Sequence, residues 1–102
     1  MVAVRVKYTV TTEYIEQNKA NIRKVMDFLK ANPIEGMLYS SFNIEGDEQT
    51  FVHINICKDG ETLSKLNDVE AFQNFRQSLK ASSPISPPQQ TKLIPVGAGF
   101  EL

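Results

Sequence analysis

Residues 2–11 alternate strictly between two kinds of side chain, and this pattern constrains the fold more than any other feature of the chain. The even positions are apolar or aromatic, whereas the odd positions carry alanine, arginine, lysine and threonine. A period of two that is rich in β-branched residues predicts a strand with one buried face. The apolar set comprises Val2, Val4, Val6, Tyr8 and Val10.

The next segment changes to helical spacing. Thr11 and Thr12 are candidate N-caps, and acidic residues follow where the positive end of a helix favours them. An amphipathic helix is therefore predicted over about residues 13–31, ending before Asn32-Pro33 because proline disfavours the helical conformation in the residue before it. Its apolar positions are Ile15, Ile22, Val25, Met26 and Leu29.

Two more strands follow, and the turn at residues 45–48 joins them as a hairpin. The first is predicted over residues 37–45 and the second over 51–57. After Lys58-Asp59-Gly60 we expect a short helical piece around residues 61–66. A further helix is then expected, capped by Asp68, with Val69, Phe72, Phe75 and Leu79 on one face.

The C-terminal part begins with a proline-rich segment, residues 82–90, for which we predict no regular structure. Residues 91–102 are predicted to form the last strand, and Pro95 favours an edge position or a bulge. The resulting order is β-α-β-β-α-β. It predicts a single ferredoxin-like α+β domain over residues 1–102, with a four-stranded antiparallel sheet and helices on one face.

The two faces of the sheet should differ in composition. We expect the helices to cover the apolar sets Val2/Val4/Val6, Leu38/Phe42/Ile44 and Val52/Ile54/Ile56. The opposite face would carry a mixed polar and aromatic set, large enough to mark an association surface, which predicts a homodimer. That set comprises Arg5, Lys7, Thr9, Tyr39, Ser41, Asn43, Phe51, His53, Asn55 and Cys57.

Composition excludes several classes of function. The formal net charge of −1 argues against binding to nucleic acid or to an anionic membrane. There is no signal-peptide pattern and no apolar run of the ~20 residues needed to span a bilayer, so we expect a cytoplasmic protein. One cysteine and one histidine provide no spacing for a metal site, and no phosphate-binding glycine loop precedes a helix. We therefore expect no cofactor.

His53 is the main candidate for chemistry, because its ordinary pKa lies near neutrality. It could act as a general base, or it could be a hydrogen-bonded structural histidine. Cys57 is more consistent with an inert buried thiol than with a nucleophile. The candidate residues for a ligand pocket or dimer face are Arg5, Tyr39, Asn43, His53 and Asn55.

Part of the chain resembles a known family. Pro33-Ile34-Glu35-Gly36 precedes a strand that starts Met37-Leu38-Tyr39, and a later helix contains Phe72 and Phe75. These features are similar to the antibiotic biosynthesis monooxygenase-like superfamily of dimeric α/β barrels. The resemblance implies a dimer. The tryptophan and histidine positions of the haem-degrading members fall on Cys57 and Leu66, whereas the cofactor-free members use polar and aromatic pocket residues.

Three functions remain open. The first is an uncharacterised small-molecule-binding dimer, and the second is a cofactor-independent monooxygenase acting on a small apolar or aromatic compound. For that enzyme, the candidate site residues are His53, Tyr39 and Asn43. The third is a structural dimerisation module. The segment 82–90 could also cap a pocket, since its prolines limit its freedom.

Overall fold

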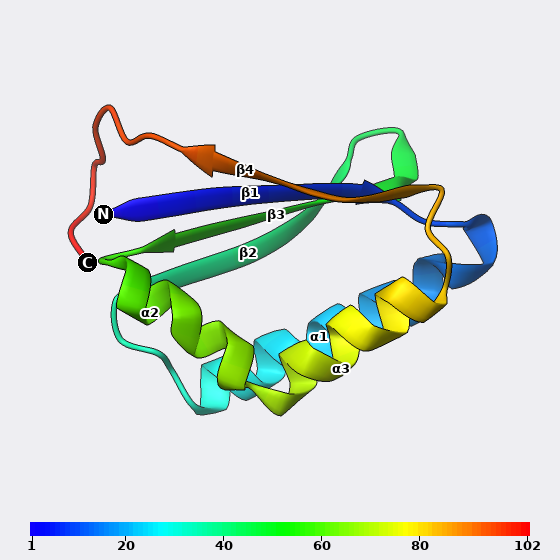
Figure 1. The fold of residues 1–102 in the computed structure, drawn as a ribbon, viewed down its shortest axis with the longest axis horizontal. Helices are drawn as coiled ribbons and strands as arrows, with labels where there is room; N and C mark the ends of the chain where they lie inside the picture. The colour runs from blue at the N-terminus through cyan, green and yellow to red at the C-terminus, as the bar shows by residue number, and fades with distance from the viewer.

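The computed structural model describes all residues from 1 to 102, and its elements follow the order of a split β-α-β repeat. The four strands form one sheet in the order β2-β3-β1-β4, and every neighbouring pair is antiparallel (Figure 1). In chain order the elements are β1 (Val2–Thr9), the 3₁₀ helix η1 (Thr12–Tyr14), α1 (Ile15–Ala31), β2 (Met37–Ile44), β3 (Asp47–Cys57), α2 (Gly60–Ser64), the 3₁₀ helix η2 (Lys65–Asp68), α3 (Glu70–Ala81) and β4 (Ser86–Leu93).

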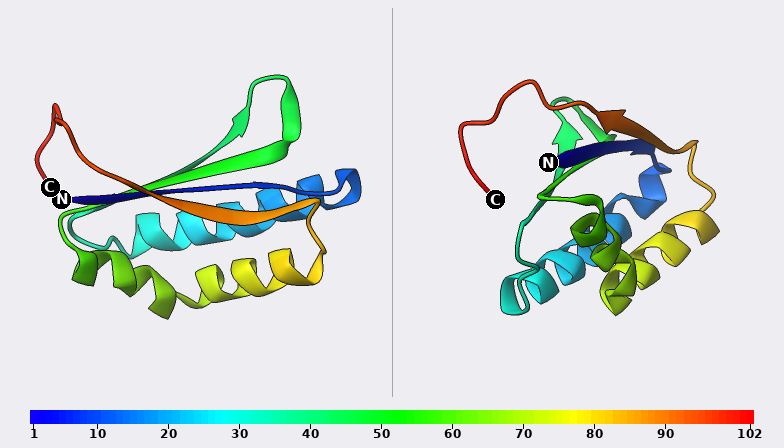
Figure 2. Two further views of the ribbon diagram at one scale, coloured as in Figure 1. Left: turned by 45° about the horizontal axis from the view of Figure 1, so that its top comes forward. Right: turned by 60° about the vertical axis from the view of Figure 1, so that its left-hand side comes forward.

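The helices all lie on one face of the sheet, with α1 and α3 side by side (Figures 1 and 2). No helix or strand covers the other face. The predicted ferredoxin-like fold, with four antiparallel strands and helices on one face, is therefore confirmed. None of the helices is long and apolar enough to cross a membrane.

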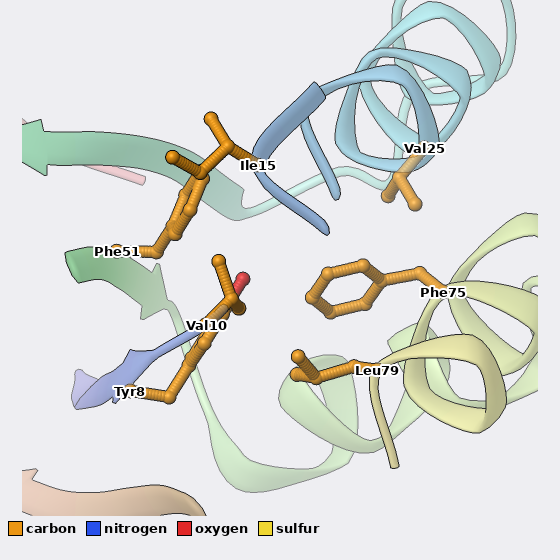
Figure 3. Packing of buried hydrophobic residues seen from close by; sticks show 7 residues of the cluster. All are labelled: Tyr8, Val10, Ile15, Val25, Phe51, Phe75 and Leu79. Atoms are coloured by element: carbon orange, nitrogen blue, oxygen red, sulfur yellow. The ribbon is translucent and has the colours of Figure 1, made fainter. Parts of the chain in front are cut away.

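The hydrophobic core lies between β1, β3, α1 and α3. Tyr8 and Phe51 come from neighbouring strands and stack with ring centroids 5.5 Å apart. Figure 3 shows Phe75 and Leu79 of α3 pointing from the helix layer toward these strands. Burying each such side chain contributes about 1.5–3 kcal/mol. The core consists of Tyr8, Val10, Ile15, Val25, Phe51, Phe75 and Leu79.

The register between β1 and β3 determines which residues face the helices. Val6 lies opposite His53 and Tyr8 lies opposite Phe51, so these residues share one face. In β2, which pairs with the other edge of β3, Tyr39 lies opposite Asn55 and so shares the same face. We call this helix side the covered face; it carries Val4, Val6, Tyr8, Tyr39, Ser41, Phe51, His53, Asn55 and Cys57.

The predicted assignment of faces was therefore wrong for β2 and β3. Their apolar positions do not lie under the helices, and the set with His53 is not on the open side. Alternation correctly predicted which residues of a single strand share a face. Which face of the neighbouring strand lies beside them depends on the register between the two strands, and alternation does not determine the register. The other side, here called the uncovered face, carries Arg5, Lys7, Thr9, Leu38, Phe42, Ile44, Val52, Ile54 and Ile56.

The C-terminal strand also differs from prediction. Residues 86–90 belong to β4, although no regular structure was expected over 82–90, and the strand ends at Leu93 rather than continuing toward residue 102. Proline is tolerated there because β4 is an edge strand. In addition, the register between β1 and β4 shifts between Lys7 and Thr9, next to Pro87 and Pro88. The two prolines, which have no N–H group to donate, therefore lie where the regular hydrogen-bond pattern is already interrupted.

The capping prediction for α3 was wrong as well. Asp68 ends the 3₁₀ helix η2, and Val69 occupies the N-cap position of α3 without a side-chain cap. The aspartate that does cap a helix is Asp59, whose Oδ1 accepts from the Thr62 amide at 2.7 Å. The cap therefore belongs to α2, the short helix that leads the chain from β3 to the helix layer.

Candidate functional site

A cavity of about 900 Å³ lies between the covered face and the helical segment from α2 to α3. Its walls are mostly apolar and include aromatic rings of α3. This volume is within the range of sites for small-molecule ligands, roughly 300–1,000 Å³. The apolar lining includes Val4, Val6, Leu63, Phe72, Phe75 and Leu79.

The polar side of the cavity is organised around His53, which is only 4% exposed. The Tyr8 hydroxyl lies 2.7 Å from its Nε2, and the Tyr39 hydroxyl lies 2.8 Å from its Nδ1. The three rings also stack, with Tyr8 and Tyr39 centroids 5.4 and 5.8 Å from that of His53. His53 is thus held from both ring nitrogens.

Asn18 of α1 extends this arrangement, since its Nδ2 donates to the Tyr8 hydroxyl at 2.8 Å. A neutral imidazole donates from one ring nitrogen and accepts at the other, so one of the two tyrosine hydroxyls donates to His53 and the other accepts from it. We call the chain Asn18–Tyr8–His53–Tyr39 the relay.

Burial keeps the relay uncharged. It lowers the pKa of His53 to about 4, because the imidazolium would be transferred out of water without a counter-ion. Burial also raises the pKa of the Tyr8 and Tyr39 hydroxyls well above their ordinary values. At neutral pH the side chains beside His53 therefore offer hydrogen-bonding groups rather than charges, and His53 is a weak base.

Asn55 lies beside the relay and also lines the cavity. It is 3% exposed, and its Oδ1 accepts from the Cys57 thiol at 3.3 Å. Its Nδ2 has no partner in the protein. Burial raises the pKa of the Cys57 thiol and so favours its protonated form, and the structure confirms that this cysteine is buried, as expected from the sequence.

Two cations of α3, Arg76 and Lys80, line the cavity at exposed positions. Arg76 donates from Nη1 to Asn67 Oδ1 at 3.1 Å, and its guanidinium lies 5.6 Å from the centre of the Phe72 ring. No aspartate or glutamate lines the cavity, and neither cation forms a salt bridge. Its charged lining is therefore entirely positive.

The proline-rich segment contributes one side of the cavity. Pro84, Pro87, Pro88 and Gln90 line it from the segment that connects α3 to β4 and from β4 itself. Ser83, just before this wall, has a φ of 55°. The structure thus places part of the predicted connector against the pocket.

The predicted site residues divide into two groups. Tyr39, His53 and Asn55 line the cavity together, whereas Arg5 and Asn43 do not. Arg5 lies opposite Ile54 on the uncovered face. Asn43 is exposed near the hairpin turn, where its Nδ2 donates to the carbonyl groups of Glu48 and Thr50.

Sequence reasoning missed one member of the relay, Asn18. For Tyr8 it favoured packing in a half-buried strand over orienting a ligand through the hydroxyl and ring. Asn18 carries a recognisable signal, however, because it lies three residues after Ile15 and four before Ile22, on the apolar side of the predicted helix. A polar residue at such a position needs a buried partner.

The structure brings together no group of three His, Cys, Asp or Glu side chains that could hold a metal ion.

Comparison with known proteins identifies the fold. No family model and no curated protein matches the sequence. A solved structure described as an antibiotic biosynthesis monooxygenase aligns over 95% of this chain and 100% of its own, with a TM-score of 0.80 and 19% identity. The chain has the antibiotic biosynthesis monooxygenase fold. The resemblance inferred from the sequence is thus confirmed at the level of the fold.

Two further structures share this fold. A proposed antibiotic biosynthesis monooxygenase from Nitrosomonas europaea has a TM-score of 0.83 at 14% identity, covering 95% of this chain and 100% of the other. SnoaB from Streptomyces nogalater, described as a cofactor-independent oxygenase, has a TM-score of 0.72 at 13% identity, covering 98% and 97%. At these identities the comparisons establish architecture rather than chemistry.

Proposed function

We propose that this protein binds a small apolar or aromatic compound in the cavity between its sheet and α3. The proposal rests on one combination of features. A cavity of about 900 Å³ has aromatic side chains in its walls, and on one side it has the uncharged polar groups of Tyr8, His53 and Tyr39. Apolar walls supply affinity by desolvation, and a few fixed polar groups orient the ligand.

The relay supports binding because its side chains are already positioned. His53 is held at both nitrogens and Tyr8 is held by Asn18, so neither has to be ordered when a ligand enters. The rings of Phe72 and Phe75, with centroids 5.9 Å apart, provide an aromatic surface nearby. A flat aromatic compound is the ligand shape that suits such a surface.

A cofactor-independent monooxygenase is the second candidate. SnoaB, which is described as such an oxygenase, shares the fold. In this alternative the substrate itself is the reductant of O₂, and His53 is the candidate catalytic residue for accepting a substrate proton. Its lowered pKa makes His53 a weak base at neutral pH, which favours the binding role over this one.

We also propose that two copies associate through the uncovered face. Phe42 is 56% exposed there, and Leu38 and Ile44 are exposed beside it. Burying such a patch against its own copy would remove apolar surface from water, which favours association. The face differs from the one predicted, but the proposed partner, a second copy of this chain, is the same. If the protein binds no ligand but does form this dimer, a structural dimerisation module is the remaining candidate function.

A cavity-filling variant tests the binding proposal. We expect the protein to bind three-ring aromatic probes such as fluorene, measured by fluorescence titration, and Leu63→Trp to weaken this binding at least tenfold. Lys24→Trp, on an exposed position of α1, is the matched control and should bind as the wild type does. Binding that is equal in both variants would place the ligand outside the cavity.

The enzyme alternative needs a separate measurement. Oxygen consumption is followed with an electron-rich phenol that the protein binds, in the wild type and in His53→Gln. A rate above the buffer blank that falls in the variant would support the monooxygenase. Binding without oxygen consumption would leave the protein as a ligand-binding dimer.

A further inference from the structure

Arg76 is held in a defined orientation at the rim of the cavity. Its Nη1 donates to Asn67 Oδ1 at 3.1 Å, and its guanidinium lies 5.6 Å from the centre of the Phe72 ring. All three residues line the cavity. A guanidinium has five N–H groups, and Asn67 accepts from only one of them, so the Nε and Nη2 groups of Arg76 have no acceptor in the protein. An oriented arginine thus presents free donors at the rim.

Lys80 places a second positive charge one turn further along α3. It lines the same cavity and, like Arg76, is exposed and forms no salt bridge. Residues four positions apart are neighbours on a helix surface, so the two charges repel each other. No Asp or Glu lies three or four positions from either residue to offset this repulsion. The helix dipole favours Lys80 in the last turn, but Arg76 lies outside that turn. The protein itself therefore supplies no anion for this pair.

A forked guanidinium beside a second cation matches a carboxylate, whose two oxygens can accept a parallel pair of N–H groups. We propose that the ligand carries a carboxylate group that binds Arg76 at the rim, with Lys80 as the supporting charge, while the apolar part of the ligand occupies the cavity. This inference rests on the proposed function and specifies its ligand class. Arg76 is the residue that determines specificity for the anion.

The rim suits an anion better than the depth of the cavity does. His53 and Tyr39 are neutral and largely buried, so a carboxylate beside them would lose its hydration without meeting a positive charge, which is costly. At Arg76 the carboxylate keeps contact with water and meets a cation. The apolar part then extends between α3 and the sheet, toward which Phe75 points (Figure 3). The ligand is therefore bound in one orientation.

A matched set of probes tests the proposal. Fluorene-9-carboxylate and fluorene-9-carboxamide have nearly the same shape and differ in charge. We expect the wild type to bind the carboxylate about five- to tenfold more tightly, the ratio that a charge-assisted hydrogen bond at an exposed site provides. Equal or reversed affinities would overturn the carboxylate inference while leaving the binding function standing. Failure of fluorene and of both derivatives to bind would reject the binding function itself.

Variants at exposed positions identify the cation. Arg76→Gln should abolish the preference for the carboxylate while leaving the affinity for the carboxamide within about twofold. Arg76→Lys keeps the charge but not the forked donors, so it should keep only part of the preference, and Lys80→Gln should reduce it in part. Lys24→Gln removes an equal charge from the outer side of α1 and should keep the full preference. A full preference in Arg76→Gln would refute the role of Arg76.

Ionic strength gives a readout that depends on no variant. Dissolved ions screen an exposed ion pair, because the Debye length falls from about 10 Å at 0.1 M salt to about 3 Å at 1 M. The affinity for the carboxylate should therefore decrease relative to that for the carboxamide as salt is added, and the ratio of the two should approach one. A ratio that stays constant would contradict an ion pair at the rim, and with it the proposal.

Discussion

Tyr8 and His53 lie 45 positions apart in the sequence, yet the Tyr8 hydroxyl is 2.7 Å from Nε2 of His53. The antiparallel pairing of β1 with β3 brings them to one face, where Val6 is opposite His53 and Tyr8 is opposite Phe51. Asn18 of α1 then donates to the same hydroxyl. The Tyr8 side chain thus links α1 to the sheet and holds the only histidine in its orientation.

Removing the Tyr8 hydroxyl should destabilise the protein. In Tyr8→Phe the ring remains, but His53 Nε2 loses its hydrogen-bond partner and Asn18 Nδ2 loses its acceptor. We expect a loss of about 1–3 kcal/mol in the free energy of unfolding, measured by urea denaturation. Tyr14→Phe is the control, since its hydroxyl is bonded to Ser78 at a half-buried site and should matter less. Equal losses would argue against a special role for the relay.

Acidification should destabilise the native state through His53. Its pKa is lowered to about 4 in the folded protein, against 6.5 ordinarily, so between these values the unfolded chain binds more protons than the native one. Stability should therefore be complete above pH 6.5 and fall by up to about 3 kcal/mol as the pH approaches 4. Urea unfolding at a series of pH values checks this, and in His53→Gln the slope over this window should flatten.

Charge on the uncovered face should separate the proposed dimer. Phe42→Glu places a carboxylate on the exposed apolar patch, where burial against a second copy would leave it unpaired. Light scattering after size exclusion should give a dimer for the wild type and a monomer of 11.5 kDa for the variant. Lys24→Glu on the outer side of α1 should remain dimeric. A monomeric wild type would reject the proposed association.

A backbone substitution tests the turn before β2. Gly36 has a φ of +80°, and an added Cβ would come within 2.5 Å of Lys58 Cδ. We expect Gly36→Ala to cost about 1–2 kcal/mol, because L-residues are disfavoured in this region and the lysine must move. Gly60→Ala is the control, since its Cβ would meet no atom within 4 Å and its φ is not positive. Thermal unfolding should separate the two variants.

The architecture was predictable because its signals are local. The alternation around Val4 and Val6, the helical spacing from Ile15 to Leu29 and the turn around Gly46 each depend on neighbouring residues. Together they predict the element order and with it the sheet topology. The proline-rich strand escaped prediction because Pro87 and Pro88 are acceptable only at an edge, and edge position is a property of the assembled sheet.

The site was predictable only in part, for a different physical reason. His53, Tyr39 and Asn55 could be grouped from alternation within each strand together with the short turn that joins the two strands as a hairpin. Whether that side faced the helices, and whether Arg5 or Tyr8 joined it, depended on the register between β1 and β3. A one-residue shift in register exchanges the two faces, and no short-range pattern distinguishes them.

The sequence by itself thus determined the order of the elements and, for the first three strands, which residues share a side. The tertiary structure alone decided which sides meet, and so placed His53 inside a cavity instead of on an open surface. The physical reason is that alternation and helical spacing are set by bonded neighbours, whereas pairing between strands some 45 residues apart is decided when the aromatic residues of β1, β3 and α3 pack together.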